Sequence, residues 1–237
     1  MKVVILCGGY ATRLYPLTSN KSKSLLPVGN KVILDHIIDK IPKNLEIIVV
    51  TNQKFYSDFS EWSKKYNRKI SVLNDGASSN ENRLGGLGDL YFAVEKGIDE
   101  DLMIILGDNL FDFDMNEVIK SFERNKRTII GVYDVKSLEE AKKFGVVRVD
   151  SLGKIKSIEE KPSLPDSTWC IAGIYLLKQE DLKKLHDYMD SDLSKEGPTY
   201  FIQHLLKSQE VYGFLFDGKW LDVGSIESYE DAKKNWN

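Results

Sequence analysis

An irregular loop that follows an apolar strand constrains this chain more than any other feature of its sequence. The run from Val3 to Leu6 is continuously apolar, which predicts a buried first strand. Two adjacent glycines, Gly8 and Gly9, follow directly, and Arg13 and Lys23 lie on the same stretch. Glycines let backbone N–H groups approach a ligand closely, and the two cations add positive charge. A loop of this kind at the carboxyl end of a strand is suited to hold a polyphosphate.

Two commoner phosphate-binding loops are excluded. A P-loop closes on Gly-Lys-Ser/Thr, whereas here Ser22 precedes Lys23. A dinucleotide fingerprint requires Gly-x-Gly-x-x-Gly, and the run from Gly8 to Arg13 lacks that spacing. The alternative is a surface turn with ordinary charged residues, since adjacent glycines are common by themselves. The clustering of the arginine, a Pro-Leu-Thr run and a Lys-x-Leu-Leu-Pro-Val run in one short stretch favours a ligand site.

Composition limits the partners that this chain can have. Its 237 residues, of which 42% are hydrophobic, suffice for one core or for a core with a small lobe. The 33 Lys and Arg nearly balance the 36 Asp and Glu, so we expect no nucleic-acid partner. No apolar segment is long enough to cross a membrane, and the glycines interrupt the apolar start, so we expect no signal peptide and a cytoplasmic protein. The two cysteines, Cys7 and Cys170, lie in apolar surroundings and fit a reducing compartment.

Strand-like and helix-like segments alternate through the first half of the chain, which predicts a parallel sheet covered by helices on both faces. The second half adds a capping box at 137–140, a hairpin over 146–159, a strand over 170–177 and helices over 199–207 and 226–234. We therefore expect an α/β fold with one Rossmann-like, mixed and mostly parallel sheet. Gly8 and Asp108 each follow the carboxyl end of a predicted strand, so these two residues should meet in space. The predicted elements of the first half are strands over 47–51, 70–73, 103–106 and 128–133, and helices over 55–66, 87–97 and 115–125.

The loop resembles the signature of the nucleotidylyltransferases that act on sugar 1-phosphates, and in particular the short core form of the glucose-1-phosphate thymidylyltransferases. That signature reads Gly-Gly-x-x-Thr-Arg-Leu-x-Pro-Leu-Thr and then Pro-Lys-x-Leu-Leu-Pro-Val. This chain departs at Ser22, where the family has proline, and the similarity continues to Gly224. The loss of proline is expected to loosen the loop without removing a phosphate contact. The resemblance implies a single nucleotidyltransferase domain, in which residues 1–135 bind nucleotide and residues 136–237 bind sugar phosphate.

The resemblance also implies roles for individual residues. A carboxylate at the end of a buried strand is a hard ligand for magnesium, although Gly-Asp-Asn by itself is also a turn sequence. The family holds Mg²⁺ at the positions of Asp108 and Asp222, and Arg13 and Lys23 occupy the catalytic positions. The expected nucleotide-binding residues are Leu6, Gly8, Gly9, Asn80 and Gly85, and the expected sugar-phosphate-binding residues are Gly145, Glu160, Lys161 and Ala172.

Recognition of the base is the part that the resemblance defines least. The segment Arg83 to Asp89 departs from the family at both of its ends. The preceding stretch is rich in amides, and an amide side chain offers both a donor and an acceptor. Either Asn80 or Asn82 could read a base edge, or both are turn residues.

The implied activity is transfer of a nucleoside monophosphate from an NTP to a sugar 1-phosphate, with release of pyrophosphate by Mg²⁺-assisted in-line displacement. The best pairing is dTTP or UTP with glucose 1-phosphate. One alternative is the same chemistry with CTP or GTP, or on another sugar phosphate or a non-sugar phosphate acceptor. A second is a non-catalytic regulatory subunit that binds a nucleotide sugar. We expect a monomer or small homo-oligomer that serves nucleotide-sugar and polysaccharide biosynthesis.

Overall fold

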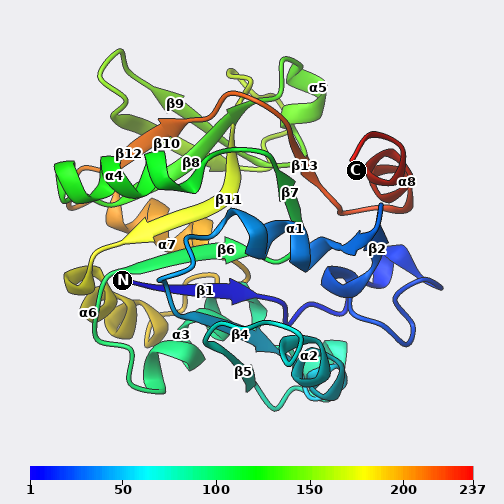
Figure 1. The fold of residues 1–237 in the computed structure, drawn as a ribbon. Helices are drawn as coiled ribbons and strands as arrows, with labels where there is room; N and C mark the ends of the chain where they lie inside the picture. Colours follow the sequence, from blue (N-terminus) through cyan, green and yellow to red (C-terminus); the bar gives the residue numbers. More distant parts are fainter. Residues whose placement is uncertain (237) are drawn as a thin grey trace.

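A nine-stranded mixed sheet runs through the centre of the protein, in a computed structural model that describes residues 1–236 (Figure 1). Its longest path has the order β10-β9-β11-β6-β1-β4-β5, and β8 and β12 extend it beside β11. The strands of the protein are β1 (Lys2–Leu6), β2 (Pro27–Val28), β3 (Lys31–Val32), β4 (Ile47–Thr51), β5 (Ile70–Asn74), β6 (Leu102–Leu106), β7 (Asn109–Phe111), β8 (Ile129–Asp134), β9 (Gly145–Val149), β10 (Ile155–Glu160), β11 (Trp169–Leu177), β12 (Tyr212–Leu215) and β13 (Trp220–Asp222).

Helices cover both faces of this sheet, as the sequence predicts (Figure 1). They are α1 (Ile33–Lys40), α2 (Tyr56–Ser63), α3 (Gly85–Glu95), α4 (Met115–Asn125), α5 (Leu138–Ala141), α6 (Gln179–Met189), α7 (Pro198–Leu205) and α8 (Ile226–Asn235), with short 3₁₀ turns η1 (Thr12–Leu14), η2 (Lys23–Leu25) and η3 (Asn80–Asn82). Within residues 1–236, none of these helices combines the length and the apolar character needed to span a membrane. The expected α/β fold with a mixed sheet is confirmed.

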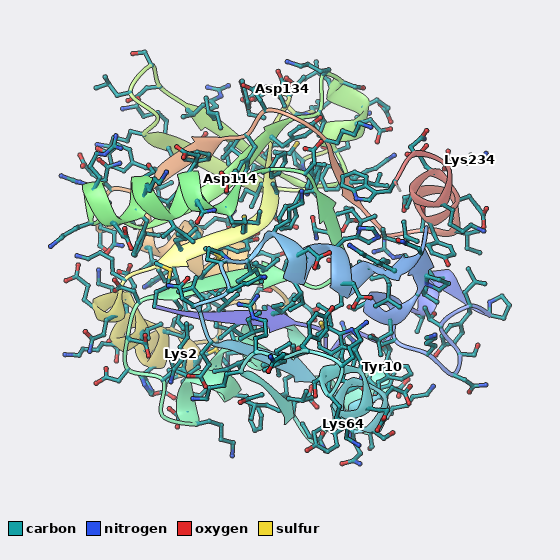
Figure 2. All side chains as sticks on the ribbon, in the orientation of Figure 1. Lys2, Tyr10, Lys64, Asp114, Asp134 and Lys234 are labelled. Atoms are coloured by element: carbon teal, nitrogen blue, oxygen red, sulfur yellow. The ribbon has the colours of Figure 1, made fainter. Side chains whose placement is uncertain are left out.

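Parallel pairing places several loops at one edge of the sheet. Strand β1 pairs in parallel with β4 on one side and with β6 on the other, and β4 pairs in parallel with β5. The carboxyl ends of these four strands therefore share an edge, which is where ligands bind in sheets of this kind. Gly8 follows β1, Asp75 follows β5 and Asp108 follows β6 at that edge. In Figure 2 the labelled Tyr10 lies beyond the end of β1 that is opposite to Lys2.

Alternation along the strands divides the core into two layers. In β1, Val3 and Ile5 face one layer, and Val4 and Leu6 face the other. The first layer is closed by apolar residues of α1, α2, α4 and α8. The second is closed by α3, α6 and α7. Because both faces are buried, the central strands read as continuous apolar runs rather than as alternating ones.

Most predicted elements lie within a few residues of their observed bounds, and two helices were not predicted. These are α1 and α6, whose apolar positions alternate with charged residues in a short span. Helix α3 begins at Gly85 and ends at Glu95, whereas the sequence pattern predicts 87–97. Gly97 has a φ of +93°, which places it outside the helix. Only half of the expected capping box forms in the described chain: the Ser137 hydroxyl accepts from the amide of Glu140 at 3.3 Å, whereas the Glu140 carboxylate pairs with Lys143 and not with the amide of Ser137.

A buried carboxylate ties α1 to α2. Asp35 is 10% exposed, and its Oδ1 accepts hydrogen bonds from Trp62 Nε1 at 2.7 Å and from both Lys65 Nζ and the Tyr66 hydroxyl at 2.6 Å. Its Oδ2 accepts from the amide of Val32 at 3.1 Å. Burial alone would raise the pKa of Asp35, but these donors outweigh it and hold the pKa below its usual value.

We expect Asp35→Ala to lower the free energy of unfolding by about 2–3 kcal/mol, because it leaves the buried indole N–H and the tyrosine hydroxyl without acceptors. Asp39 lies on the same helix as Asp35 and forms an exposed ion pair with Lys31 of β3. Asp39→Ala removes that ion pair and should lower the free energy of unfolding by less than about 1 kcal/mol. Urea denaturation measures both. The Asp35 contribution should be complete above about pH 4 and be lost as the pH falls through the lowered pKa. Equal losses in the two variants would contradict the role of the network.

Candidate functional site

The loop after β1 has the geometry of an anion cradle. Among the described residues, no protein acceptor takes the N–H groups of Gly8, Gly9, Tyr10 or Ala11. Hydrogen bonds from outside fix the loop, with Asn52 Nδ2 donating to the carbonyl of Gly8 at 2.9 Å and the Tyr10 hydroxyl donating to a backbone carbonyl at 2.9 Å. Ala11 has a φ of +49°, in the left-handed region, and so turns the chain sharply. Free amides on a preorganised loop suit a phosphate chain.

A cavity of about 410 Å³ opens over this loop, and a neighbouring one of about 190 Å³ adjoins it. Four residues line both cavities, namely Leu6, Gly9, Arg83 and Asp108. The larger cavity is also lined by Arg13, Lys23 and Asn80, and the smaller by Gly8, Gly85 and Gly86. The structure thus brings the predicted phosphate-binding cations and the first predicted metal ligand to one place. Their assignment to particular substrate atoms remains a prediction.

An ion pair crosses the floor of the larger cavity. Lys23 Nζ lies 2.6 Å from Asp108 Oδ2, and the two side chains are only 14% and 27% exposed. The other oxygen of Asp108 accepts from Asn109 Nδ2 at 2.8 Å. Burial would raise the pKa of Asp108, but the charge and hydrogen bond of Lys23 outweigh burial and lower it. Asp108 is therefore ionised at neutral pH.

The departure from the family signature at Ser22 does not alter the backbone of the loop. Ser22 has a φ of −62°, close to the value that the proline ring imposes, and a ψ of 142°, which proline can also adopt. Its side chain is buried, and its carbonyl accepts from the amide of Leu25 at 3.0 Å. The conformation of this segment is therefore one that proline could also adopt, and the looser loop expected from the loss of proline stays a prediction.

The second predicted metal ligand lies beside the first. Strand β13 pairs antiparallel with β7 so that Asp222 is opposite Asn109, and the amide of Val223 donates to the carbonyl of Asp108 at 2.9 Å. Burial and the negative charge of Asp108 raise the pKa of Asp222 to about 7, and Lys23, Arg13 and Lys161 offset this rise in part. A Cβ at Gly224 would lie 2.6 Å from Asp222 Oδ2 and 3.8 Å from Arg13 Nη2, so this glycine leaves room for both side chains.

Two adjoining half-buried carboxylates fit a divalent cation. Magnesium bound with substrate phosphates takes one or two carboxylates and completes its shell with phosphate oxygens and water. In residues 1–236 there is no cluster of three or more His, Cys, Asp and Glu side chains that could hold a metal by itself. The donor set of Asp108 and Asp222 therefore suits a cation that arrives with a phosphate substrate.

A carboxylate oxygen without a partner marks the sugar-phosphate part of the predicted site. Glu160 ends β10 opposite Gly145, and its buried Oε2 has no hydrogen-bond partner in the described chain. A Cβ at Gly145 would lie 2.9 Å from this oxygen and 3.3 Å from Thr199 Cγ2. Burial raises the pKa of Glu160, and the charge of Lys161 opposes that rise. A buried acceptor with nothing to accept from is a position for a ligand hydroxyl.

Two predicted contacts take other forms in the structure. Ala172 is fully buried in the first core layer, so its side chain is part of the core and only its backbone is available for a ligand. The amide oxygen of Asn82 accepts from the amides of Ser78 and Ser79 at 3.1 and 2.9 Å. Asn82 therefore acts as a turn residue, and Asn80 is the one of the two asparagines that lines the larger cavity.

Sequence reasoning missed a strap between Arg83 and Glu196, which both line the smaller cavity. Arg83 Nη2 lies 3.1 Å from both carboxylate oxygens of Glu196, and its Nη1 donates to the carbonyl of Asn80 at 3.0 Å. The amide of Gly86 donates to the carbonyl of Glu196 at 2.8 Å. A Cβ at Gly85 would lie 2.6 Å from the carbonyl oxygen of Lys195, so the glycine pair lets the two segments meet. The only signal in the sequence that could have indicated this contact is the unusual Arg-Leu-Gly-Gly run that begins at Arg83.

The two adjacent glycines differ in their packing, and this difference gives a test. We expect Gly8→Ala to destabilise the protein by about 1–3 kcal/mol, since its Cβ would lie 2.3 Å from Asp89 Oδ2. Gly9→Ala is the matched control, because a Cβ there meets nothing within 4 Å. It should change the free energy of unfolding by less than about 0.5 kcal/mol. Urea denaturation decides, and a Gly8→Ala variant as stable as Gly9→Ala would contradict the packing described.

Three curated proteins resemble this chain over nearly its whole length. The chain is 31% identical over 237 residues to the bifunctional protein GlmU of Methanocaldococcus jannaschii, and the match covers 99% of this chain and 54% of that protein. GlmU of Methanococcus aeolicus is 31% identical over 232 residues, with 98% and 53% covered. The chain thus spans about half the length of these relatives. The UTP–glucose-1-phosphate uridylyltransferase AglF of Haloferax volcanii is 27% identical over 237 residues, with 99% of this chain and 96% of that protein covered.

Solved structures share the fold. One described as a glucose-1-phosphate thymidylyltransferase from Bacillus anthracis, in complex with sucrose, superimposes with a TM-score of 0.85 at 25% identity, covering 99% of this chain and 94% of the other. A UDP-glucose pyrophosphorylase complexed with UDP-glucose matches with a TM-score of 0.84 at 22% identity, covering 99% and 97%. A sequence profile described as Nucleotidyl transferase matches residues 2–237. This chain belongs to the nucleotidyl transferase family.

Proposed function

We propose that this protein transfers a nucleoside monophosphate from an NTP to a sugar 1-phosphate. The observation that carries the proposal is the gathering of Arg13, Lys23 and Asp108 around one cavity, with Asp222 beside Asp108 and next to the free amides of the loop after β1. Glu160, with its unpartnered buried oxygen, adds a position for an acceptor hydroxyl. A polyphosphate, a divalent cation and a hydroxylated acceptor would satisfy these groups together.

In the proposed reaction a phosphate oxygen of the acceptor attacks the α-phosphorus of the NTP, and the bond from that phosphorus to the bridging oxygen of pyrophosphate breaks. Both reactants are anions, so catalysis depends on positioning and on neutralising charge. The loop amides and Arg13 hold the leaving pyrophosphate. Lys23 neutralises charge that develops on the α-phosphate, and Lys161 orients the attacking phosphate. Mg²⁺, held by Asp108 and Asp222, would supply further charge neutralisation when bound.

We assign the two parts of the chain to the two substrates. We assign residues 1–135 to the nucleotide, with Leu6, Gly8, Gly9, Asn80 and Gly85 around it. Residues 136–237 are assigned to the sugar phosphate, with Gly145, Glu160 and the backbone of Ala172 around it. Support comes from the two cavities over the first part and from the paired ends of β9 and β10 in the second.

Glucose 1-phosphate with UTP or dTTP is the proposed substrate pair. The name of AglF gives UTP and glucose 1-phosphate as its substrates, and the Bacillus anthracis structure is described as a thymidylyltransferase. We expect a panel of five NTPs crossed with several sugar 1-phosphates to give the fastest pyrophosphate release with one of these pairs. Chelation of Mg²⁺ with EDTA should abolish release and added Mg²⁺ should restore it. Nucleotide binding without pyrophosphate release from any pair would contradict the proposal and favour a binding protein.

Removal of the Lys23 ammonium tests the mechanism itself. We expect Lys23→Met to lower kcat on the order of 10²- to 10³-fold, as for other preorganised charge stabilisers. Lys21→Met is the matched control, because Lys21 is exposed on the same loop. It should leave kcat within about twofold of the parent. Steady-state turnover with Mg²⁺ measures both, and thermal melting shows that each variant is folded. Undiminished kcat in folded Lys23→Met would remove Lys23 from the reaction.

A further inference from the structure

Two carboxyl groups outside the proposed reaction lie against the first glycine of the phosphate-binding loop. Asp75 follows β5, and Asp89 lies on the buried side of α3 with 4% of the residue exposed. A Cβ at Gly8 would lie 2.3 Å from Asp89 Oδ2 and 3.1 Å from Asp75 Oδ2. Asp89 also lines the smaller cavity together with Gly8, Gly85 and Gly86. The pair therefore supports the loop from beneath at the place where a nucleotide would bind.

No cation compensates the charge of this pair. In the described part of the chain, neither Asp75 nor Asp89 forms an ion pair, and the buried Asp75 Oδ2 and Asp89 Oδ1 have no donor apart from the two carboxyl groups themselves. Asp75 Oδ1 accepts from the amide of Ala77 at 2.7 Å. Two ionised carboxylates are not stable side by side in a buried site, and one shared proton removes the conflict.

The other titratable groups around the pair leave this conclusion unchanged. The loop after β1 contributes the thiol of Cys7 and the hydroxyl of Tyr10, and burial raises the pKa of both, so they are neutral at pH 7. Asp108 lies in the same cavity and adds negative charge. Arg83, which lines that cavity too, is engaged with Glu196.

We propose that Asp89 is a positioning residue that works as a carboxylic acid, sharing one proton with Asp75 and so holding Gly8 and its loop in the conformation that binds the NTP. The inference rests on the proposed function in one respect, namely that the nucleotide occupies the cavities over this loop. Loss of the proton sets two carboxylates against each other beneath Gly8 and adds negative charge under a polyphosphate. Both effects weaken nucleotide binding.

The direction of the pH effect follows from the proton count. Burial, the charge of Asp75 and their hydrogen bond raise the pKa of Asp89 to about 8, and burial raises that of Asp75 as well. The binding-competent form carries the proton, so affinity is full below that pKa and falls as the pH rises through it. A single lost proton weakens binding about tenfold for each pH unit above the pKa.

Titration calorimetry of UTP and, in parallel, dTTP in the presence of Mg²⁺ and without acceptor tests the proposal. Between pH 7.0 and 9.0 we expect the parent protein to lose about tenfold in nucleotide affinity, following the pKa of about 8. Asp89→Asn mimics the neutral acid in shape, and Asp75→Asn supplies an amide donor in place of the shared proton. Each variant should bind nucleotide with an affinity within about threefold of the parent at pH 7.0. Neither variant should lose affinity between pH 7.0 and 9.0. The control Asp58→Asn, an exposed change on α2, should keep the parental loss.

Several outcomes overturn the inference. They are a parent whose affinity is flat to pH 9.0, an alkaline loss that persists in either pair variant, or a folded Asp89→Asn protein that binds more than tenfold worse at pH 7.0. Failure of both nucleotides to bind the parent does so as well. Because no acceptor is present, this result is independent of the pyrophosphate-release panel, whose failure would bear on the proposed function alone. If the variants do not fold, infrared spectroscopy of the parent decides, since a protonated carboxyl that titrates near pH 8 must be seen.

Discussion

The contact between Lys23 and Asp108 is the interaction on which the rest of the site depends. It joins residues 85 positions apart in sequence at 2.6 Å, and it forms only because β1 and β6 run side by side in the same direction. Parallel pairing brings the loop after one strand against the loop after the other. The pairing is in turn held by two core layers, one on each face of the sheet.

Charge balance links this contact to the remaining groups. A lysine alone would neutralise Asp108, but Asp222 lies beside it and is half-buried as well. Arg13, Lys23 and Lys161 surround Asp222 without pairing it as closely as Lys23 pairs Asp108. The site without ligands thus combines cations that can bind phosphate with carboxylates that can bind metal. Each set partly neutralises the other until substrates arrive.

Fold class and the main cluster were predictable from sequence because their signals are local. The apolar runs predicted the central strands, and the Gly-Gly loop with its cations predicted the end of the sheet that we propose binds phosphate. Ser22 shows a limit of local patterns, since it departs from the family signature and yet has backbone angles that are compatible with proline. Helix α6 was missed because its buried face contributes only a few apolar residues between charges. The strap between Arg83 and Glu196 joins residues 113 positions apart, and no local pattern specifies such a contact.

The same argument applies to Asp89, which by sequence was only a departure from the family pattern. Its neighbours Asp75 and Gly8 come from two other elements, so their shared environment exists only in the folded chain. Buried groups without partners were the features that sequence could not supply, at Asp89 and equally at Glu160.

The position of the last strand and helix has a consequence for how the protein acquires its activity during synthesis. The hydroxyl of Tyr229 in α8 donates to the carbonyl of Pro27 at 2.8 Å across 202 residues. Just before that helix, Asp222 on β13 lies opposite Asn109, the neighbour of Asp108. Contacts of such long range form late, because the intervening chain must first be ordered. A nascent polypeptide on the ribosome can therefore build the phosphate loop early, yet it lacks the second carboxylate until nearly all of this domain has emerged.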